Sequence, residues 1–307
     1  EYMNILFAGS PAPSAEVLKF IKEKTSHEIV GVVTQPDKRR KRGNLKIESD
    51  VSKMANDLSL KIFKPHCLDE DFKQSILNLD FDVLLVSAYG KILPEWFLKS
   101  PSKIAINIHY SLLPKYRGAS PIQSVILNNE KKTGISFMRM SLGMDEGDIV
   151  QSHELTIDKS WNKTQLEFQL SALSISKISG LLNQIDNGDL SYTKQDSDKA
   201  TYCKKINKGD SLVDFSMSSN EIENKFKAFN EWPGISFIYK ENLIKIHNMF
   251  EEETNSLVAP GKIISFTKDG LSIKTDDSSI VITHLQFPNK NIISSQDAFN
   301  SYRDFFR

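Results

Sequence analysis

The sequence has few cysteines and no net charge. Its 307 residues include only two cysteines, Cys67 and Cys203, which show neither a CxxC motif nor metal-ligand spacing with a histidine. We therefore expect a reducing compartment and no structural disulfide. The 39 Lys and Arg residues balance the 39 Asp and Glu residues, so no global field draws the chain to a nucleic acid or a membrane. Any site for a polyanion must be a local patch.

Long apolar runs and a dinucleotide fingerprint are also missing. No run is long enough to span a bilayer and no signal-peptide pattern is present, so we expect a cytoplasmic protein without a membrane partner. The first turn, residues 9–13, carries one glycine instead of GxGxxG, so NAD binding is not indicated. Nothing in the sequence demands more than a monomer.

The order of apolar segments predicts two domains. Strand and helix patterns alternate over residues 3–188, which predicts a Rossmann-like, mostly parallel sheet in an α/β catalytic domain, with Ser14 capping the first helix. Residues 189–210 are polar and lysine-rich, as in an interdomain linker with a basic surface. Short strands follow over residues 211–307, the first of them at 212–215, and predict a small, OB-like β-barrel.

Two polar side chains interrupt the end of one apolar strand. Residues 104–109, IAINIH, predict a buried strand of a parallel sheet. Residues two apart on a strand face the same side, so Asn107 and His109 are expected in one crevice at the carboxyl edge. The next ten residues are rich in proline and glycine and predict an irregular, ligand-binding loop. Taken alone, His109 could instead be a histidine bound to a backbone carbonyl.

An acidic loop completes this candidate site. The sequence GMDEGD, residues 143–148, places Asp145 between two glycines, which suits a sharp turn that presents its carboxylate. Asp148 is the alternative acid, and an Asx-type turn without a function is the simpler interpretation of Asp145. With Asn107 and His109, the carboxylate would form an acid/base site.

Two further segments have both a structural and a functional interpretation. Tyr89 and Gly90 end the most apolar strand; they either terminate it or offer backbone groups to a flat heterocycle. The run from Lys38 to Arg42 is either a charged surface loop or a loop that binds phosphates.

These motifs together resemble the folate-dependent formyltransferases, the group that contains glycinamide ribonucleotide formyltransferase. The resemblance covers nearly the whole chain and is carried by NIHYSLLPKYRGASPIQ, GMDEGDIV, ILFAGSP, TQPD, AYGKILP, KAFNEWPG and SSQDAF. It implies catalytic roles for Asn107, His109 and Asp145, with 10-formyltetrahydrofolate as co-substrate and no metal. The implied folate-binding residues are Tyr89, Gly90, Ile92, Ser111, Leu112, Leu113 and Pro114. Tyr110 stands where the family usually has a small residue, which raises the question of whether it narrows the folate entrance.

Within this family, the chain is most similar to the members that formylate the methionine of initiator methionyl-tRNA for translation initiation. The resemblance implies tRNA contacts by basic residues of the inserted loop and the linker: Lys38, Arg39, Arg40, Lys41, Arg42, Lys204, Lys205 and Lys208. A formyltransferase for a nucleotide-linked amino sugar shares the HxSLLP core and remains an alternative. A non-catalytic RNA-binding protein with the same fold is a more distant one.

Overall fold

The computed structural model describes residues 2–39 and 46–307. The chain forms two compact units. The N-terminal unit comprises Glu1–Pro121, Lys131–Ile157 and Leu166–Cys203, and the C-terminal unit comprises Ile122–Glu130, Asp158–Gln165 and Lys204–Arg307. The segment expected as a linker, residues 189–210, therefore divides between the units at Cys203.

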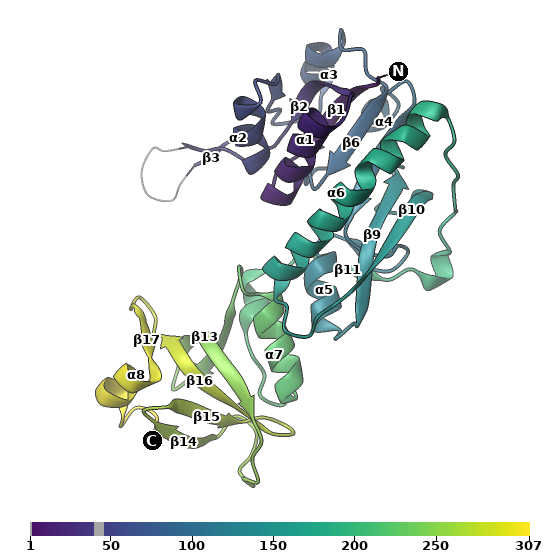
Figure 1. The fold of residues 1–307 in the computed structure, drawn as a ribbon. Helices are drawn as coiled ribbons and strands as arrows, with labels where there is room; N and C mark the ends of the chain where they lie inside the picture. The colour runs from purple at the N-terminus through teal and green to yellow at the C-terminus, as the bar shows by residue number, and fades with distance from the viewer. Residues whose placement is uncertain (1, 40–45) are drawn as a thin grey trace. The chain divides into compact units, whose positions relative to one another are not determined.

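A mostly parallel sheet forms the centre of the N-terminal unit (Figure 1). Its described strands follow the order β10 (Ile149–Thr156), β9 (Lys132–Arg139), β7 (Ile104–His109), β6 (Val83–Ser87), β1 (Asn4–Gly9), β2 (Glu28–Val33) and β5 (Ile62–Phe63). The pairs from β7 to β5 are parallel, whereas β9 is antiparallel to both β7 and β10. The Rossmann-like sheet predicted from the alternating pattern is thus confirmed.

The strands at the middle of this sheet are buried because helices pack against them. All five residues of β6 are buried, as expected for a strand covered on both faces. The helices that begin in the N-terminal unit are α1 (Ala12–Lys24), α2 (Asp50–Asp57), α3 (Glu70–Ile76), α4 (Glu95–Leu98) and α5 (Pro121–Leu127); α6 (Lys163–Asn187) ends in it. None of the helices in the described part of the chain is long and apolar enough to cross a membrane.

The predicted N-cap of the first helix is wrong. Helix α1 begins at Ala12, with Pro11 in the cap position and Pro13 in the first turn, where the amide that proline lacks needs no intrahelical partner. Ser14 is buried inside the helix, and its hydroxyl donates to the carbonyl oxygen of Ser87 at 2.5 Å. The serine joins α1 to the end of β6 instead of starting the helix.

The C-terminal unit has an antiparallel sheet, as the short alternating segments predicted. The described strands follow the order β12 (Ile235–Tyr239), β13 (Asn242–Glu252), β16 (Ser279–Gln286), β15 (Gly270–Lys274) and β14 (Ile263–Thr267), with β17 (Ile292–Ser294) paired to β16. Helices α7 (Ser219–Ala228) and α8 (Ser295–Tyr302) accompany it. The prediction of a strand at 212–215 is wrong, because this segment makes only one bridge among the described residues, between Leu212 and Ser236. Helix α8 was not predicted.

Candidate active site

The two polar residues of β7 lie where the sequence placed them. Asn107 is half-buried and sits between Val86 of β6 and Met138 of β9 in the strand register. No described residue hydrogen-bonds to its side-chain amide. His109 is two residues further along and is buried, with an exposed fraction of 6%. The amide of Asn107 is therefore available to a substrate carbonyl or oxyanion.

A backbone carbonyl fixes the orientation of the His109 ring. Nε2 of His109 lies 2.8 Å from the carbonyl oxygen of Tyr116. A carbonyl oxygen can only accept, so we assign the proton of the neutral ring to Nε2. Nδ1 then carries the lone pair, and it faces Oδ2 of Asp145 at 3.8 Å. That distance is too long for a hydrogen bond but short enough for an ion pair once the ring is protonated.

Asp145, and not Asp148, faces the histidine. Its backbone adopts φ +52°, the left-handed region, within the turn predicted from the flanking glycines. Oδ2 of Asp145 accepts a hydrogen bond of 2.9 Å from the amide of Gly118. Asp148 instead forms an ion pair with Arg139, whose amide also donates to the Asp148 carbonyl at 2.8 Å. The structure thus brings Asp145 and His109 together and pairs Asp148 with Arg139.

Ser136 holds the SLLP segment, residues 111–114. Its hydroxyl donates to the carbonyl of Ser111 at 2.7 Å and accepts from the amide of Leu113 at 3.1 Å. Ser136 lies on β9 directly opposite His109, and it is fully buried. Ser111 is equally buried, and its hydroxyl donates to the Lys115 carbonyl at 2.7 Å. The segment expected to contact folate is therefore fixed to the strand beside His109.

The turn after β6 offers main-chain groups, not the tyrosine side chain. The carbonyl of Tyr89 accepts a hydrogen bond of 2.8 Å from Nε2 of Gln35, and Gly90 has φ +82°. The ring of Tyr89 lies in the core, where burial raises its hydroxyl pKa to about 12. Ile92, by contrast, is 88% exposed. Nζ of Lys91 donates to the carbonyls of Pro65 and His66 at 2.8 and 2.6 Å and so joins this turn to the segment that follows β5.

Tyr110 directly follows β7 and lies against α6. Its hydroxyl is buried beside Ser171 and Ser174 of α6, and this burial raises its pKa. These neighbours place the Tyr110 side chain at the helix.

The described part of the basic run lies on a short hairpin. β3 (Lys38–Arg39) pairs with β4 (Lys46–Ile47), and both basic side chains of β3 are exposed. Arg40, Lys41 and Arg42 lie outside the described residues. Nζ of Lys64 forms ion pairs with Asp37 at 2.7 Å and Glu48 at 3.0 Å, one before β3 and one after β4. Burial alone would lower the pKa of Lys64, but the two carboxylates outweigh burial and raise it.

Residues 193–203 pack on the loop that follows β7. β11 (Tyr202–Cys203) pairs in parallel with β8 (Arg117–Gly118), and the Thr201 hydroxyl accepts from the Tyr116 amide at 2.8 Å. The Cys203 thiol is buried and donates to the Arg117 carbonyl at 3.3 Å. Gly118 has φ +115°, and a Cβ atom there would lie 2.3 Å from the Cys203 carbonyl oxygen. Only glycine fits this turn.

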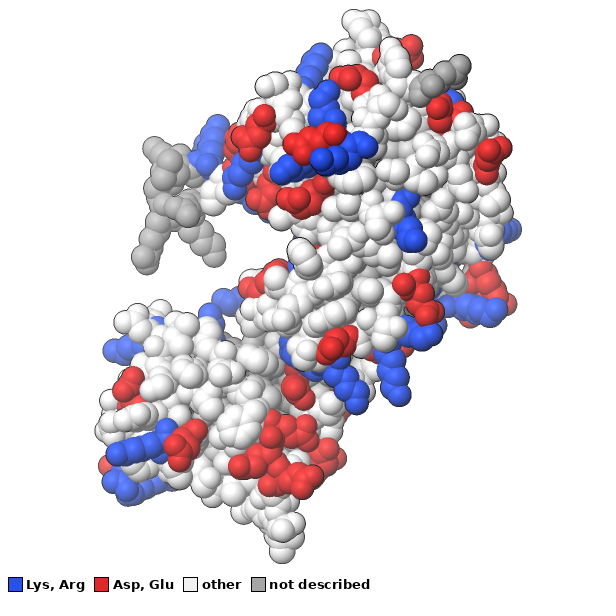
Figure 2. Space-filling view, in the orientation of Figure 1, with Lys and Arg blue, Asp and Glu red and all other residues white. Residues whose placement is uncertain are grey.

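The lysines expected to contact RNA follow this segment directly. Lys204, Lys205 and Lys208 are exposed, and Lys208 begins a short 3-10 helix that ends at Ser211. They belong to the C-terminal unit, whereas the acid/base pair belongs to the N-terminal unit. Figure 2 shows that blue and red side chains are intermixed over the face in view, in keeping with the balanced net charge.

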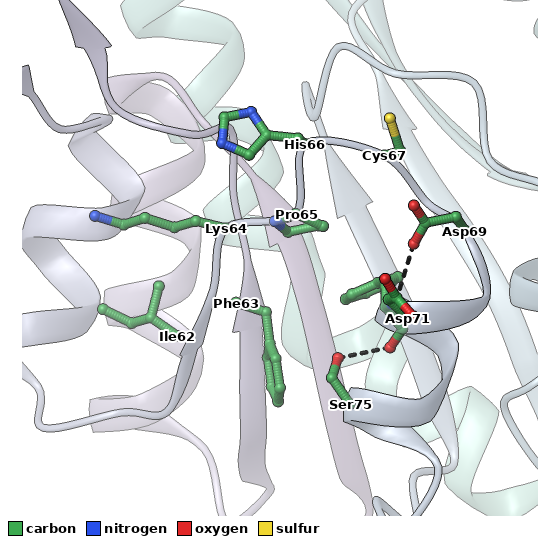
Figure 3. Close-up of a pocket in the computed structure, with 10 residues that line it drawn as sticks. Ile62, Phe63, Lys64, Pro65, His66, Cys67, Asp69, Asp71 and Ser75 are labelled. Atoms are coloured by element: carbon green, nitrogen blue, oxygen red, sulfur yellow. Dashed lines mark hydrogen bonds between the residues drawn. The ribbon is translucent and has the colours of Figure 1, made fainter.

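A separate open cavity of about 500 Å³ lies between β5 and α3. It is lined by Phe63, His66, Cys67 and Asp71 among others, and it includes none of the three predicted catalytic residues. Figure 3 shows the Lys64 side chain extended away from Asp71, consistent with its ion pairs at the hairpin. The residues within 2–39 and 46–307 contain no group of three or more His, Cys, Asp or Glu that could hold a metal ion.

Comparison with known proteins identifies the class. Residues 3–177 match the formyl transferase family, and residues 205–303 match the formyl transferase C-terminal domain. The chain therefore belongs to the formyl transferase family.

Two curated relatives are named methionyl-tRNA formyltransferase. The one from Sulfurihydrogenibium sp. (strain YO3AOP1) is 35% identical over 304 residues, covering 98% of this chain and 97% of the relative. The one from Buchnera aphidicola subsp. Acyrthosiphon pisum (strain Tuc7) is 36% identical over 310 residues, covering 99% and 98%.

A solved structure supports the fold assignment. WlaRD, described as a sugar 3N-formyl transferase in the presence of dTDP and 5-N-formyl-THF, superposes with a TM-score of 0.66. The match covers 94% of this chain and 99% of WlaRD at 24% sequence identity. The likeness therefore extends over both units.

Proposed function

We propose that the protein transfers the formyl group of 10-formyltetrahydrofolate to the α-amine of methionine on initiator methionyl-tRNA. The observation that carries this proposal is the arrangement of Asn107, His109 and Asp145 at one sheet edge, in a chain 35% identical over nearly its full length to an enzyme named methionyl-tRNA formyltransferase. Such a reaction would take place in the cytoplasm, where initiator tRNA is charged. A monomer suffices, because all three side chains come from one chain.

The residues have separate tasks in this reaction. The uncharged amine attacks the formyl carbon, and a C–N bond forms as the carbonyl oxygen becomes an oxyanion. The amide of Asn107 donates to that oxygen. Neutral His109 accepts the amine proton at Nδ1, the atom that faces Asp145, and its Nε2–H remains on the Tyr116 carbonyl. As the bond to N10 breaks, the same proton passes to N10 of the departing tetrahydrofolate.

Asp145 supports this cycle by charge. Protonated His109 is an imidazolium whose Nδ1 lies 3.8 Å from the Asp145 carboxylate. The pair attracts only while the ring is charged, so the carboxylate stabilises the intermediate more than the resting state. In this scheme His109 can donate to the oxyanion only after it has taken up a proton, and Asn107 is the donor from the start.

The folate and tRNA would use different parts of the surface. We assign folate binding to the backbone of Tyr89 and Gly90, to Ile92 and to residues 111–114, since all of these lie at the ends of β6 and β7. We assign tRNA phosphates to the basic run Lys38, Arg39, Arg40, Lys41 and Arg42 and to Lys204, Lys205 and Lys208.

The test is a formyl-transfer assay with several acceptors. Labelled formyl from 10-formyltetrahydrofolate is offered to initiator methionyl-tRNA, to uncharged tRNA and to a nucleotide-linked amino sugar. Label on the charged tRNA alone is the expected result. Label on the sugar would support the proposed acid/base site but show that the acceptor is an amino sugar and not tRNA. The fold likeness to WlaRD is the reason to include this acceptor. Label on neither, with tRNA still bound, would indicate a binding protein.

A further inference from the structure

Gln195 is a buried side chain with every hydrogen-bonding group in use. It lies in residues 193–203 and is 5% exposed. Its Nε2 donates to the carbonyl oxygens of Asp145 at 2.8 Å and Gly147 at 2.7 Å. Its Oε1 accepts from Nε of Arg117 at 3.0 Å. The amide therefore joins the acidic loop to the turn that follows β7.

The loop needs this support because of its backbone conformation. Asp145 adopts φ +52°, a region that residues other than glycine rarely occupy. The amide of Gly118 holds its carboxylate and Gln195 holds its carbonyl, so both ends of the residue are tied. Without the bonds from Gln195, nothing described holds the Asp145 carbonyl in this orientation.

Three consecutive residues connect Gln195 to the histidine as well. Tyr116 accepts from His109 through its carbonyl, Gly118 donates to Asp145, and Arg117 between them donates to Gln195. Arg117 is 2% exposed, and its guanidinium also donates to the Tyr202 hydroxyl at 3.2 Å. These hydrogen bonds and the Tyr116–Arg117 peptide link form an unbroken chain from His109 to Asp145 through Tyr116, Arg117 and Gln195.

We propose that Gln195 is a positioning residue for formyl transfer. It touches no reacting atom; it fixes the Asp145 carboxylate against Nδ1 of His109 by holding the main chain of the acidic loop. Displacements of about 1 Å in such a site can cost on the order of 10²-fold in rate. The inference rests on the function proposed above, because it concerns the same site and reaction.

The test uses two substitutions that leave the volume nearly unchanged. Gln195→Leu removes both donors and the acceptor, whereas Gln195→Glu keeps an acceptor for Arg117 and loses the donors. We expect each to lower kcat by about 10- to 100-fold and to change KM for either substrate by less than about 2-fold. Gln184→Leu is the matched control: Gln184 is exposed on α6, and its side chain bonds only to Gln151. It should turn over normally.

A double-mutant cycle separates positioning from general damage. If Gln195 acts through the Asp145 carboxylate, Gln195→Leu should cost almost nothing in kcat when added to Asp145→Asn. Losses that multiply in the double variant would overturn the proposal, as would normal kcat in Gln195→Leu or Gln195→Glu. A kcat loss that only follows the lost folded fraction, measured by circular dichroism on the same samples, would also overturn it. Absence of transfer by the unmodified protein would instead reject the proposed function.

Discussion

Nδ1 of His109 lies 3.8 Å from Oδ2 of Asp145, on the side of the ring opposite its hydrogen bond to a backbone carbonyl. The carbonyl selects the tautomer and the carboxylate faces the other ring nitrogen, so the two partners act at different points of the proposed cycle. The carboxylate can be tested by a substitution that leaves the carbonyl in place.

Asp145→Asn removes the charge and retains an oxygen for the Gly118 amide. We expect kcat to fall by about 10²-fold, with the fold and the Kd for folate unchanged, because only the imidazolium loses its partner. Single-turnover kinetics together with a folate titration provide the measurement. Turnover near the unmodified rate would remove Asp145 from the mechanism.

Ser136→Ala cuts both hydrogen bonds that hold the SLLP segment, each worth about 1 kcal/mol of stability. We expect the folate KM to rise several-fold with little change in the tRNA KM. Ser176→Ala is the matched control, since Ser176 is exposed on α6 and its hydroxyl donates to the Leu173 carbonyl of the same helix at 2.7 Å. Equal effects of the two variants would show that the segment is held in another way.

Lys64→Met releases the ion pairs at both ends of the basic hairpin. The pKa of Lys64 is raised in the folded state, so its contribution to stability is present below the ordinary pKa of 10.5 and is lost as the pH rises through the folded-state pKa. The unmodified protein should therefore have the higher Tm at pH 8, and the difference should shrink above pH 10.5. A Tm difference that stays constant across this window would contradict the assignment.

Arg42→Ala removes one cation that the family resemblance assigns to tRNA. We expect a higher KM for charged tRNA. We also expect the dependence of log KM on log salt concentration to become shallower by about one, because one phosphate contact is lost. Lys53→Ala is the control for general loss of charge, because the Lys53 side chain is exposed on α2. A change in folate KM with an unaltered tRNA KM would assign the loop to the other substrate.

The sequence predicted those parts of the site that depend on short spacings. Asn107 and His109 are two residues apart on one strand, and Asp145 stands between two glycines, so local rules placed them. Strand periodicity likewise predicted most of both sheets. Ser14 was misplaced because the preference for serine as an N-cap is a local rule, while its bond to Ser87 spans 73 residues.

The supporting residues could not be predicted in this way. Gln195 and Arg117 are separated by 78 residues, Cys203 and Arg117 by 86, and Ser136 and Leu113 by 23. A glutamine in a polar, lysine-rich stretch carries no local signal of burial, so residues 189–210 suggested a solvated linker throughout. Only the folded chain shows that part of it packs on the loop that follows β7.

The two cysteines differ in accessibility: Cys67 is exposed, and Cys203 is buried against the Arg117 carbonyl. A maleimide should therefore label one thiol in the native protein and both after unfolding. The slow labelling of Cys203 would time the local opening of the β8–β11 pair, beside the turn that holds His109 and Asp145. The rate of Cys203 labelling would thus report how long the turn that binds His109 and Asp145 stays folded.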